Sequence, residues 1–176
     1  IFRKKGIEVL LLSDRVDEWV VTALTEFDGK PLHSVAKGAL DLGELADAEE
    51  KAQAERETEA LKPLVERLRT ALGERVKDVR VTHRLTDSPA CLVSDGAGMS
   101  ARQERVLREA GHDVPLQKRI LELNGDHAVV QKLQTITDEA QFADWSALLY
   151  DQALLAEGSL PADPAAFSRR VAALMA

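Results

Sequence analysis

A strongly acidic, alanine-rich stretch divides this chain of 176 residues into two parts. Between Asp41 and Glu59 it carries eight carboxylates against only two basic side chains, Lys51 and Arg56. The alanines favour a helix, but the apolar residues are too sparse to form a buried face. We therefore expect residues 41–60 to form an acidic connector or a half-exposed helix, with separate domains at 1–40 and 61–176.

The overall composition narrows the class of protein. With 45% hydrophobic residues the chain is typical of globular proteins, and no apolar run approaches the roughly 20 residues of a membrane span. The net charge of −7 disfavours binding to nucleic acid. A single cysteine, Cys91, excludes an internal disulfide and suits a cytoplasmic location. Because the chain begins with Ile1 and not with Met, we expect it to be a fragment of a longer protein.

The first part of the chain predicts a small strand, helix, strand unit. A continuous apolar run over residues 6–13 predicts a buried strand. Apolar positions then recur at helical spacing from Val16 to Leu24, and Asp14 is the expected N-cap. Asp28-Gly29 predicts a turn and residues 31–36 a second short strand. This unit should be the end of a preceding domain.

The second part predicts three strands and several helices. Pro63 should break or restart the acidic helix, and a short helix should follow as far as Gly73. Period-two alternation predicts a strand over Val79–Leu85, and short apolar runs predict two more at 90–94 and 116–123. We expect the three strands to pair into one sheet, so that the fold class is α+β.

Two C-terminal helices carry more apolar surface than one small sheet can easily cover. Asp126, Thr137 and Asp163 are the expected N-caps of the helices in this last third of the chain. A second copy could cover the apolar surface by forming a four-helix bundle across a twofold axis. An ordinary intramolecular core is the alternative. The residues expected in the dimer interface are Phe142, Trp145, Leu148, Leu149, Leu155, Phe167, Val171 and Leu174.

A further helix, expected between Met99 and Ala110, has only a thin apolar line. Most of its residues are charged, and Val106 and Leu107 are the apolar residues at its centre. Such a helix either docks lightly on its own domain or forms an exposed adhesive edge. Periodicity alone does not distinguish these interpretations.

Residues suited to catalysis or metal binding are scattered along the chain. The histidines show neither a paired metal-ligand spacing nor a nearby nucleophile motif, and Gly96 and Gly98 lack the lysine of a phosphate-binding loop. Cys91 lies in an apolar run, which favours a core residue over an activated thiolate. We expect no catalytic residue and no metal site. The alternative is a small-molecule enzyme that uses His83, Cys91 or His127 in a pocket.

Several segments, spread in order over the chain, carry a family resemblance. They are DEW at 17–19 with LTEFDGK at 24–30, GERVKDVR at 73–80, RLTDSPA at 84–90, LELN at 121–124 and LLYDQALLAE at 148–157. Together they resemble the bacterial members of the ninety-kilodalton heat-shock chaperone family. The resemblance implies that residues 1–40 end a middle domain and that the rest is a C-terminal dimerisation domain.

The resemblance also implies a function. The intact chain would be an ATP-dependent, homodimeric chaperone of the stress response that binds unfolded or partly folded client proteins and other chaperones. ATP and Mg²⁺ would be bound by an N-terminal domain outside this chain, so this part has no cofactor and should not hydrolyse ATP. By matching position, the client-binding residues are Trp19, Thr22, Met99, Val106 and Leu107.

Two of these residues depart from the family pattern, which has an asparagine at Thr22 and an aromatic residue at Leu107. A purely structural dimerisation module, without client contact, is the second alternative function.

Overall fold

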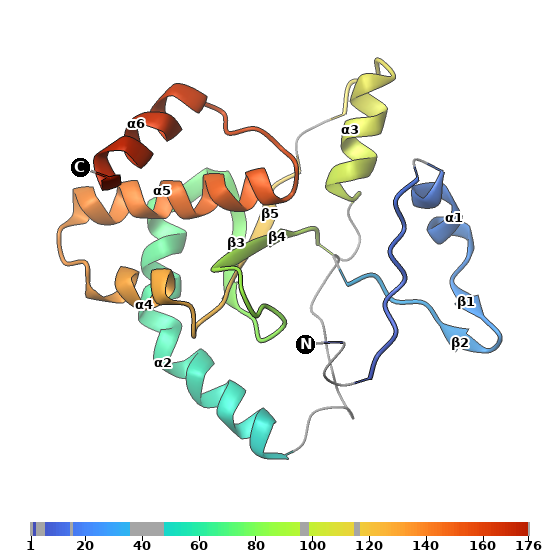
Figure 1. Ribbon diagram of the computed structural model, residues 1–176, viewed down its shortest axis with the longest axis horizontal. Coiled ribbons are helices and arrows are strands. Elements are labelled where there is room, and N and C mark those ends of the chain that lie inside the picture. The colour runs from blue at the N-terminus through green and yellow to red at the C-terminus, as the bar shows by residue number, and fades with distance from the viewer. Residues whose placement is uncertain are drawn as a thin grey trace. The chain divides into compact units, whose positions relative to one another are not determined.

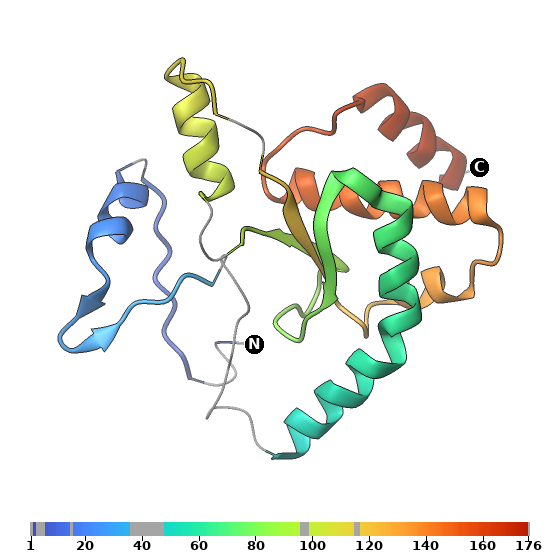
Figure 2. The same ribbon diagram turned by 180° about the vertical axis from the view of Figure 1, so that it is seen from behind.

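The computed structural model describes residues 2, 6–14, 16–35, 48–95, 99–114 and 117–175. The chain forms two compact units. The first unit comprises Ile1–Asp41 and Ser94–Gln117, and the second comprises Leu42–Val93 and Lys118–Ala176. Figures 1 and 2 show the elements of both units from opposite sides. The described residues contain six α-helices and two small sheets, which confirms the α+β class.

The first unit contains two helices and a short hairpin. Helix α1 spans Asp17–Ala23 and helix α3 spans Ala101–Glu109. Strands β1 (Glu26–Phe27) and β2 (Lys30–Pro31) pair antiparallel. Asp28 and Gly29 join them with φ values of 51° and 70°, and positive φ at both positions is what a tight two-residue hairpin requires. The predicted helix and turn are confirmed.

The predicted order of strand, helix, strand in this unit is wrong. Residues 7–13 form no strand, because the strands described in this unit pair only with each other. The second predicted strand is reduced to Lys30–Pro31, while residues 32–34 lie beyond the ladder and Ala36 lies outside the described residues. Asp14 is not the cap: its N–H donates to Asp17 Oδ2 at 2.7 Å, and Val16 occupies the N-cap position.

A mixed three-stranded sheet organises the second unit. Strand β5 (Arg119–Leu123) lies in the centre, parallel to β3 (Val76–Val81) and antiparallel to β4 (Ala90–Val93). The prediction of three strands in one sheet is confirmed. Strand β3 ends before the predicted Leu85, because the ladder of β5 ends at Leu123, whose carbonyl accepts from the N–H of Thr82 at 2.9 Å.

The register gives this sheet one mainly apolar face and one face that carries most of its polar residues, which we call the polar face. Val79, Leu121 and Leu92 are paired across the three strands, and Arg80, Glu122 and Cys91 form the next row. Because successive side chains of a strand point to opposite faces, the two rows lie on opposite sides of the sheet.

The described part of the acidic stretch, from Ala48 onward, forms the first half of a long helix, and residues 41–47 lie outside the described residues. Helix α2 runs from Ala48 to Leu72 and passes through Pro63 without a break, so the predicted interruption is wrong. A proline inside a helix costs about 3 kcal/mol. Leucines on both sides of it are 0–5% exposed, and their packing offsets that cost; they are Leu61, Leu64, Leu68 and Leu72. The helix ends before Gly73, which has a φ of 50°, as expected.

Three helices follow the sheet: α4 (Ala128–Thr135), α5 (Glu139–Ala156) and α6 (Pro164–Met175). Two predicted caps are displaced by one residue. His127 Nδ1, and not Asp126, accepts from the N–H of Val129 at 3.1 Å, and Asp138, and not Thr137, caps α5. Asp163 caps α6 as predicted, since its Oδ1 accepts from the N–H of Ala166 at 2.8 Å.

Helices α2, α4 and α5 pack with the sheet to form the hydrophobic core of the second unit (Figure 2). The innermost side chains come from every one of these elements, and the largest that are under 2% exposed are Phe142, Leu68, Leu121, Leu123, Leu133 and Leu149. Helix α6 packs on α5 but contributes no buried residue. It is therefore the most weakly attached helix of this unit.

Candidate association surfaces

The five predicted client-binding residues all lie in the first unit. Trp19 is 54% exposed on α1, where Thr22 is exposed as well. Met99 precedes α3, and Val106 and Leu107 lie on it; all three are half-buried. The structure thus brings the residues of both predicted segments into one unit.

Local sequence explains why helix α3 forms. Ser100 Oγ accepts from the N–H of Gln103 at 3.0 Å, and Gln103 Oε1 accepts from the N–H of Ser100 at 2.9 Å, which is a capping box. Glu104 and Arg108 then form an ion pair with a separation of 3.5 Å, one turn apart. Gly111 ends the helix with a φ of 85°.

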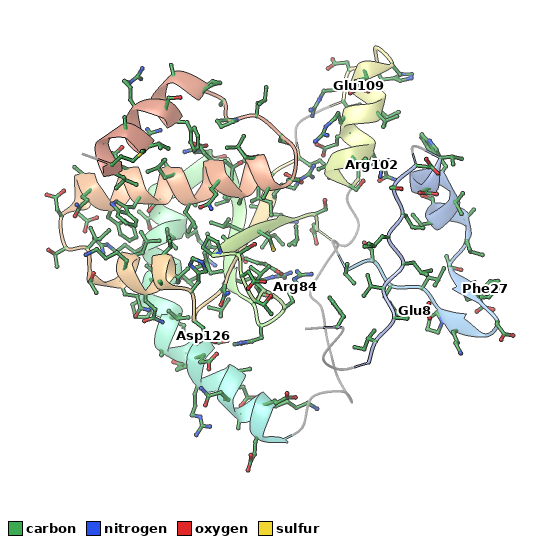
Figure 3. The ribbon with its side chains drawn as sticks, in the orientation of Figure 1. Glu8, Phe27, Arg84, Arg102, Glu109 and Asp126 are labelled. Carbon is green, nitrogen blue, oxygen red and sulfur yellow. The ribbon has the colours of Figure 1, made fainter. Side chains whose placement is uncertain are left out.

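Helix α3 docks on the first unit through a charged side chain. The guanidinium of Arg102, labelled in Figure 3, donates to the carbonyl of Leu12 at 3.2 Å and also to the carbonyl of Ser13. Together with the half-buried Val106 and Leu107, this contact favours the docked interpretation of the helix. Sequence periodicity could not indicate it, because the two partners are about 90 residues apart in the chain.

Large apolar side chains near Trp19 in the sequence are exposed. Phe27, labelled on the hairpin in Figure 3, is 69% exposed. Others between 41% and 88% exposed are Leu10, Leu11, Leu12, Val16, Val20 and Leu24. Sequence reasoning assigned this apolar content to a core, and the only signal against that assignment was the small number of partner elements. Val16, Trp19 and Val20 are spaced to share one face of α1, and we call them, together with Phe27 on the hairpin, the α1 surface.

The predicted dimer residues divide by burial. Phe142 is 1% exposed and Leu149 is 2% exposed, so both belong to the core of this chain. For these two residues the alternative of an ordinary intramolecular core holds. Trp145 packs partly on that core, and Leu148, Phe167 and Val171 are half-buried.

The remaining predicted dimer residues are exposed, Leu155 at 41% and Leu174 at 51%. Leu160 at 79% and Met175 at 82% were missed; Leu160 lies between α5 and α6, and Met175 directly follows Leu174. Self-association stays a prediction, and these four side chains are the large apolar ones that are exposed among the described residues of the second unit. Because Arg170 of α6 contacts Asp144 near the start of α5, Leu174 and Met175 lie toward one end of this helix pair and Leu155 and Leu160 toward the other; we call these four residues together the α5–α6 surface.

The polar face of the sheet holds a buried carboxylate. Glu122 is 2% exposed, and its Oε1 accepts from Arg80 Nε at 2.8 Å and Nη2 at 2.6 Å. Its Oε2 accepts from Arg84, whose side chain is labelled in Figure 3, and lies 3.9 Å from Cys91 Sγ. Burial, followed by the charge of Glu122, raises the pKa of the Cys91 thiol to about 11. The thiol is therefore protonated at neutral pH, in line with the interpretation of Cys91 as a packing residue.

None of the residues proposed for the enzyme alternative lines the cavity that the described residues form on α2 and α4. This cavity, of about 210 Å³, is lined by Ala60, Pro63, Leu64, Arg67 and Gln134. His83 instead lies with Nδ1 3.3 Å from Glu57, and His127 caps α4. Among the residues that the structure describes, no group of three or more histidine, cysteine or acidic side chains is placed to hold a metal. No helix in the described ranges is long and apolar enough to cross a membrane.

Comparison with known proteins gives a consistent result over the whole chain. A family model described as "Hsp90 protein" matches residues 1–176. Over 175 residues, 99% of the chain, it is 58% identical to "Chaperone protein HtpG" of Burkholderia lata and 59% identical to that of Bordetella pertussis. The protein of the same name from Methylococcus capsulatus is 55% identical. The chain spans only 27–28% of the length of these relatives. Because the family model covers every residue, the chain belongs to the Hsp90 protein family.

Proposed function

We propose that this chain is the self-associating and client-holding part of an ATP-dependent molecular chaperone that acts in the stress response. Family membership and the chaperone names of its relatives support the proposal. The observation that carries it is the exposure of large apolar side chains in two places, the α1 surface and the α5–α6 surface. Exposed apolar patches are typical of surfaces that bind other proteins.

The α5–α6 surface is the proposed contact with a second copy. Its four side chains are 41–82% exposed. Burying each would contribute about 2 kcal/mol before the entropy cost of association. Two helices from each copy would meet as a four-helix bundle across a twofold axis. Phe142 and Leu149 then support this bundle from the core and do not contact the second copy.

The α1 surface and the apolar line of α3 are the proposed contact with clients. Non-native proteins expose apolar segments that their native folds bury, and exposed Trp19 and Phe27 offer large aromatic area to such segments. ATP and Mg²⁺ would be bound by the part of the longer protein outside this chain, in the cytoplasm. The residues of this chain then supply association and not hydrolysis.

Self-association is tested by light scattering of the chain at micromolar concentration. We expect a dimer for the unchanged chain and a monomer for Leu174→Glu, because a charge would be buried at the contact. Ala165→Glu is the matched control, since it adds the same charge at an exposed position near the other end of α6. A monomer for the unchanged chain, or a dimer for Leu174→Glu, contradicts the proposed contact.

Client binding is tested by suppression of the aggregation of a heat-denatured reporter protein. Trp19→Asp and Leu107→Glu should each weaken suppression, while the dimer and the circular dichroism of the chain stay unchanged. Ala71→Glu, exposed on α2 of the second unit, is the control. Equal suppression by all variants would support the alternative of a purely structural dimerisation module.

A further inference from the structure

Helix α6 is held on its unit mainly along one thin line. None of its residues is fully buried, and Phe167, Arg170 and Val171 are half-buried. Its last residues, Leu174 and Met175, are 51% and 82% exposed. An apolar line of this kind resists separation from α5 but leaves sliding and rotation of α6 along α5 weakly restricted, because hydrophobic contact is not directional.

Arg170 supplies the directional contact. Its Nε donates to Asp144 Oδ1 at 2.9 Å, and its Nη1 lies 4.0 Å from Asp151 Oδ2. Asp144 and Asp151 are seven residues apart on α5, which places them on one face about 10 Å apart along the helix axis. A planar guanidinium that spans two carboxylates separated in this way fixes both the position and the rotation of the helix that carries it.

Asp151 is itself held rigidly from the opposite side. Its side chain is only 3% exposed, and Oδ1 accepts from Arg75 Nη2 at 2.5 Å. Arg75 also stacks on the ring of Tyr150, with its guanidinium carbon 4.5 Å from the ring centroid, and Tyr150 donates its hydroxyl to the Arg75 carbonyl at 3.1 Å. A buried carboxylate requires paired cations, and Arg75 already supplies one. Asp151 therefore keeps its position whether or not Arg170 is present, and offers Arg170 a fixed partner.

We propose that Arg170, bridging Asp144 and Asp151, is a positioning residue that orients α6 for association with a second copy of this chain. The inference rests on the proposed self-association through the α5–α6 surface. Arg170 would act on the contact through Leu174 and Met175, which lie one turn further along α6, and would not need to touch the second copy. A small rotation of α6 would move these two side chains out of register with the partner helices.

The test uses Arg170→Met, which keeps the aliphatic stem of the side chain and removes its charge. Arg169→Met is the matched control, because Arg169 is the exposed neighbour on the same helix. By sedimentation equilibrium, Arg170→Met should weaken the dimer roughly tenfold, while Arg169→Met should change its dissociation constant less than about twofold. Arg170→Lys, which can reach only one of the two carboxylates, should fall between them.

Hydrogen exchange separates a positioning role from a general structural one. In chains diluted to the monomer, Arg170→Met should speed exchange of the amides of α6 and leave those of β5 unchanged. Faster exchange in β5 as well, or a dimer of Arg170→Met as tight as that of Arg169→Met, would overturn the inference. A third outcome separates the two proposals. If the unchanged chain is a monomer whose α6 amides are protected, and Arg170→Met loses that protection, the proposed self-association is overturned while the Arg170 contact is established.

Discussion

The two units use similar apolar sequences with opposite results. In the second unit the leucines of β5, Leu121 and Leu123, are 0% exposed. In the first unit the run at residues 9–12 is at least as apolar, yet Leu11 is 88% exposed. Strand β5 has a partner strand on each edge and helices over one face, whereas residues 7–13 pair with no strand among the described residues. An apolar run therefore becomes core only where other elements supply partners, and otherwise remains a surface that can associate.

The comparison is tested most directly by truncating one leucine in each unit. Leu121→Ala should lower the free energy of unfolding by about 3 kcal/mol, because it removes a fully buried side chain and leaves a cavity. Leu11→Ala should change it by less than about 0.5 kcal/mol, because its side chain is already in solvent. Urea unfolding of both variants provides the measurement. A loss for Leu11→Ala as large as that for Leu121→Ala would mean that the first unit buries this run after all.

The charged groups of the second unit offer a second test. Glu122→Gln removes the negative charge that pairs with Arg80 and Arg84, and we expect a loss of about 2 kcal/mol, because two partly buried guanidinium groups are left without their counter-charge. Glu74→Gln also removes one carboxylate from an ion pair, with Lys118, but Glu74 is 94% exposed. Its unfolding transition should match that of the unchanged chain. Equal transitions for the two variants would contradict the burial of the Glu122 cluster.

Much of the fold of the second unit could be predicted because its patterns are local. Alternation located the second half of β3 but not its start at Val76, short apolar runs located β4 and β5, and glycine located the end of α2. The errors arise where distant parts of the chain decide the outcome. Leucines packed on the core carry α2 through Pro63, and the missing partner strand leaves residues 7–13 without a ladder.

The association surfaces could be predicted only in part. The family resemblance, and not periodicity, singled out Trp19, which is exposed. Periodicity placed Phe142 and Leu149 on the same face as Trp145 but could not tell that the core of the same chain covers that face. Arg170 was not found, because its two carboxylate partners lie on a different helix, 26 and 19 residues earlier.

The reactivity of the Cys91 thiol measures how far solvent is excluded from the polar face of the sheet in the second unit. At pH 8 the folded thiol should react with a disulfide reagent roughly a hundredfold more slowly than the thiol of the urea-unfolded chain, because its pKa is about 11 against an ordinary value of 9.0. The same shift predicts a pH dependence of stability. Since the unfolded thiol loses its proton first, this contribution to stability is present below pH 9 and is lost as the pH rises toward 11.

Reaction rates of the folded chain measured from pH 7 to pH 10 supply the check, with the urea-unfolded chain as control. A folded thiol that titrates near pH 9 would show that solvent reaches the row formed by Arg80, Glu122 and Cys91.

The two tryptophans, one in each unit, allow the difference in solvent exposure between the units to be measured by fluorescence. This is the smallest effect that we predict. Trp145→Phe leaves Trp19 of the first unit as the only tryptophan, and Trp19→Phe leaves Trp145 of the second. Acrylamide should quench the fluorescence of Trp19, which is 54% exposed, more strongly than that of the half-buried Trp145, which packs against the core. As the control, both variants are unfolded in urea, where acrylamide should quench Trp19 and Trp145 equally. If a bound client covers the α1 surface, quenching of Trp19 should fall while that of Trp145 stays constant, and an unchanged Trp19 signal would place the client elsewhere.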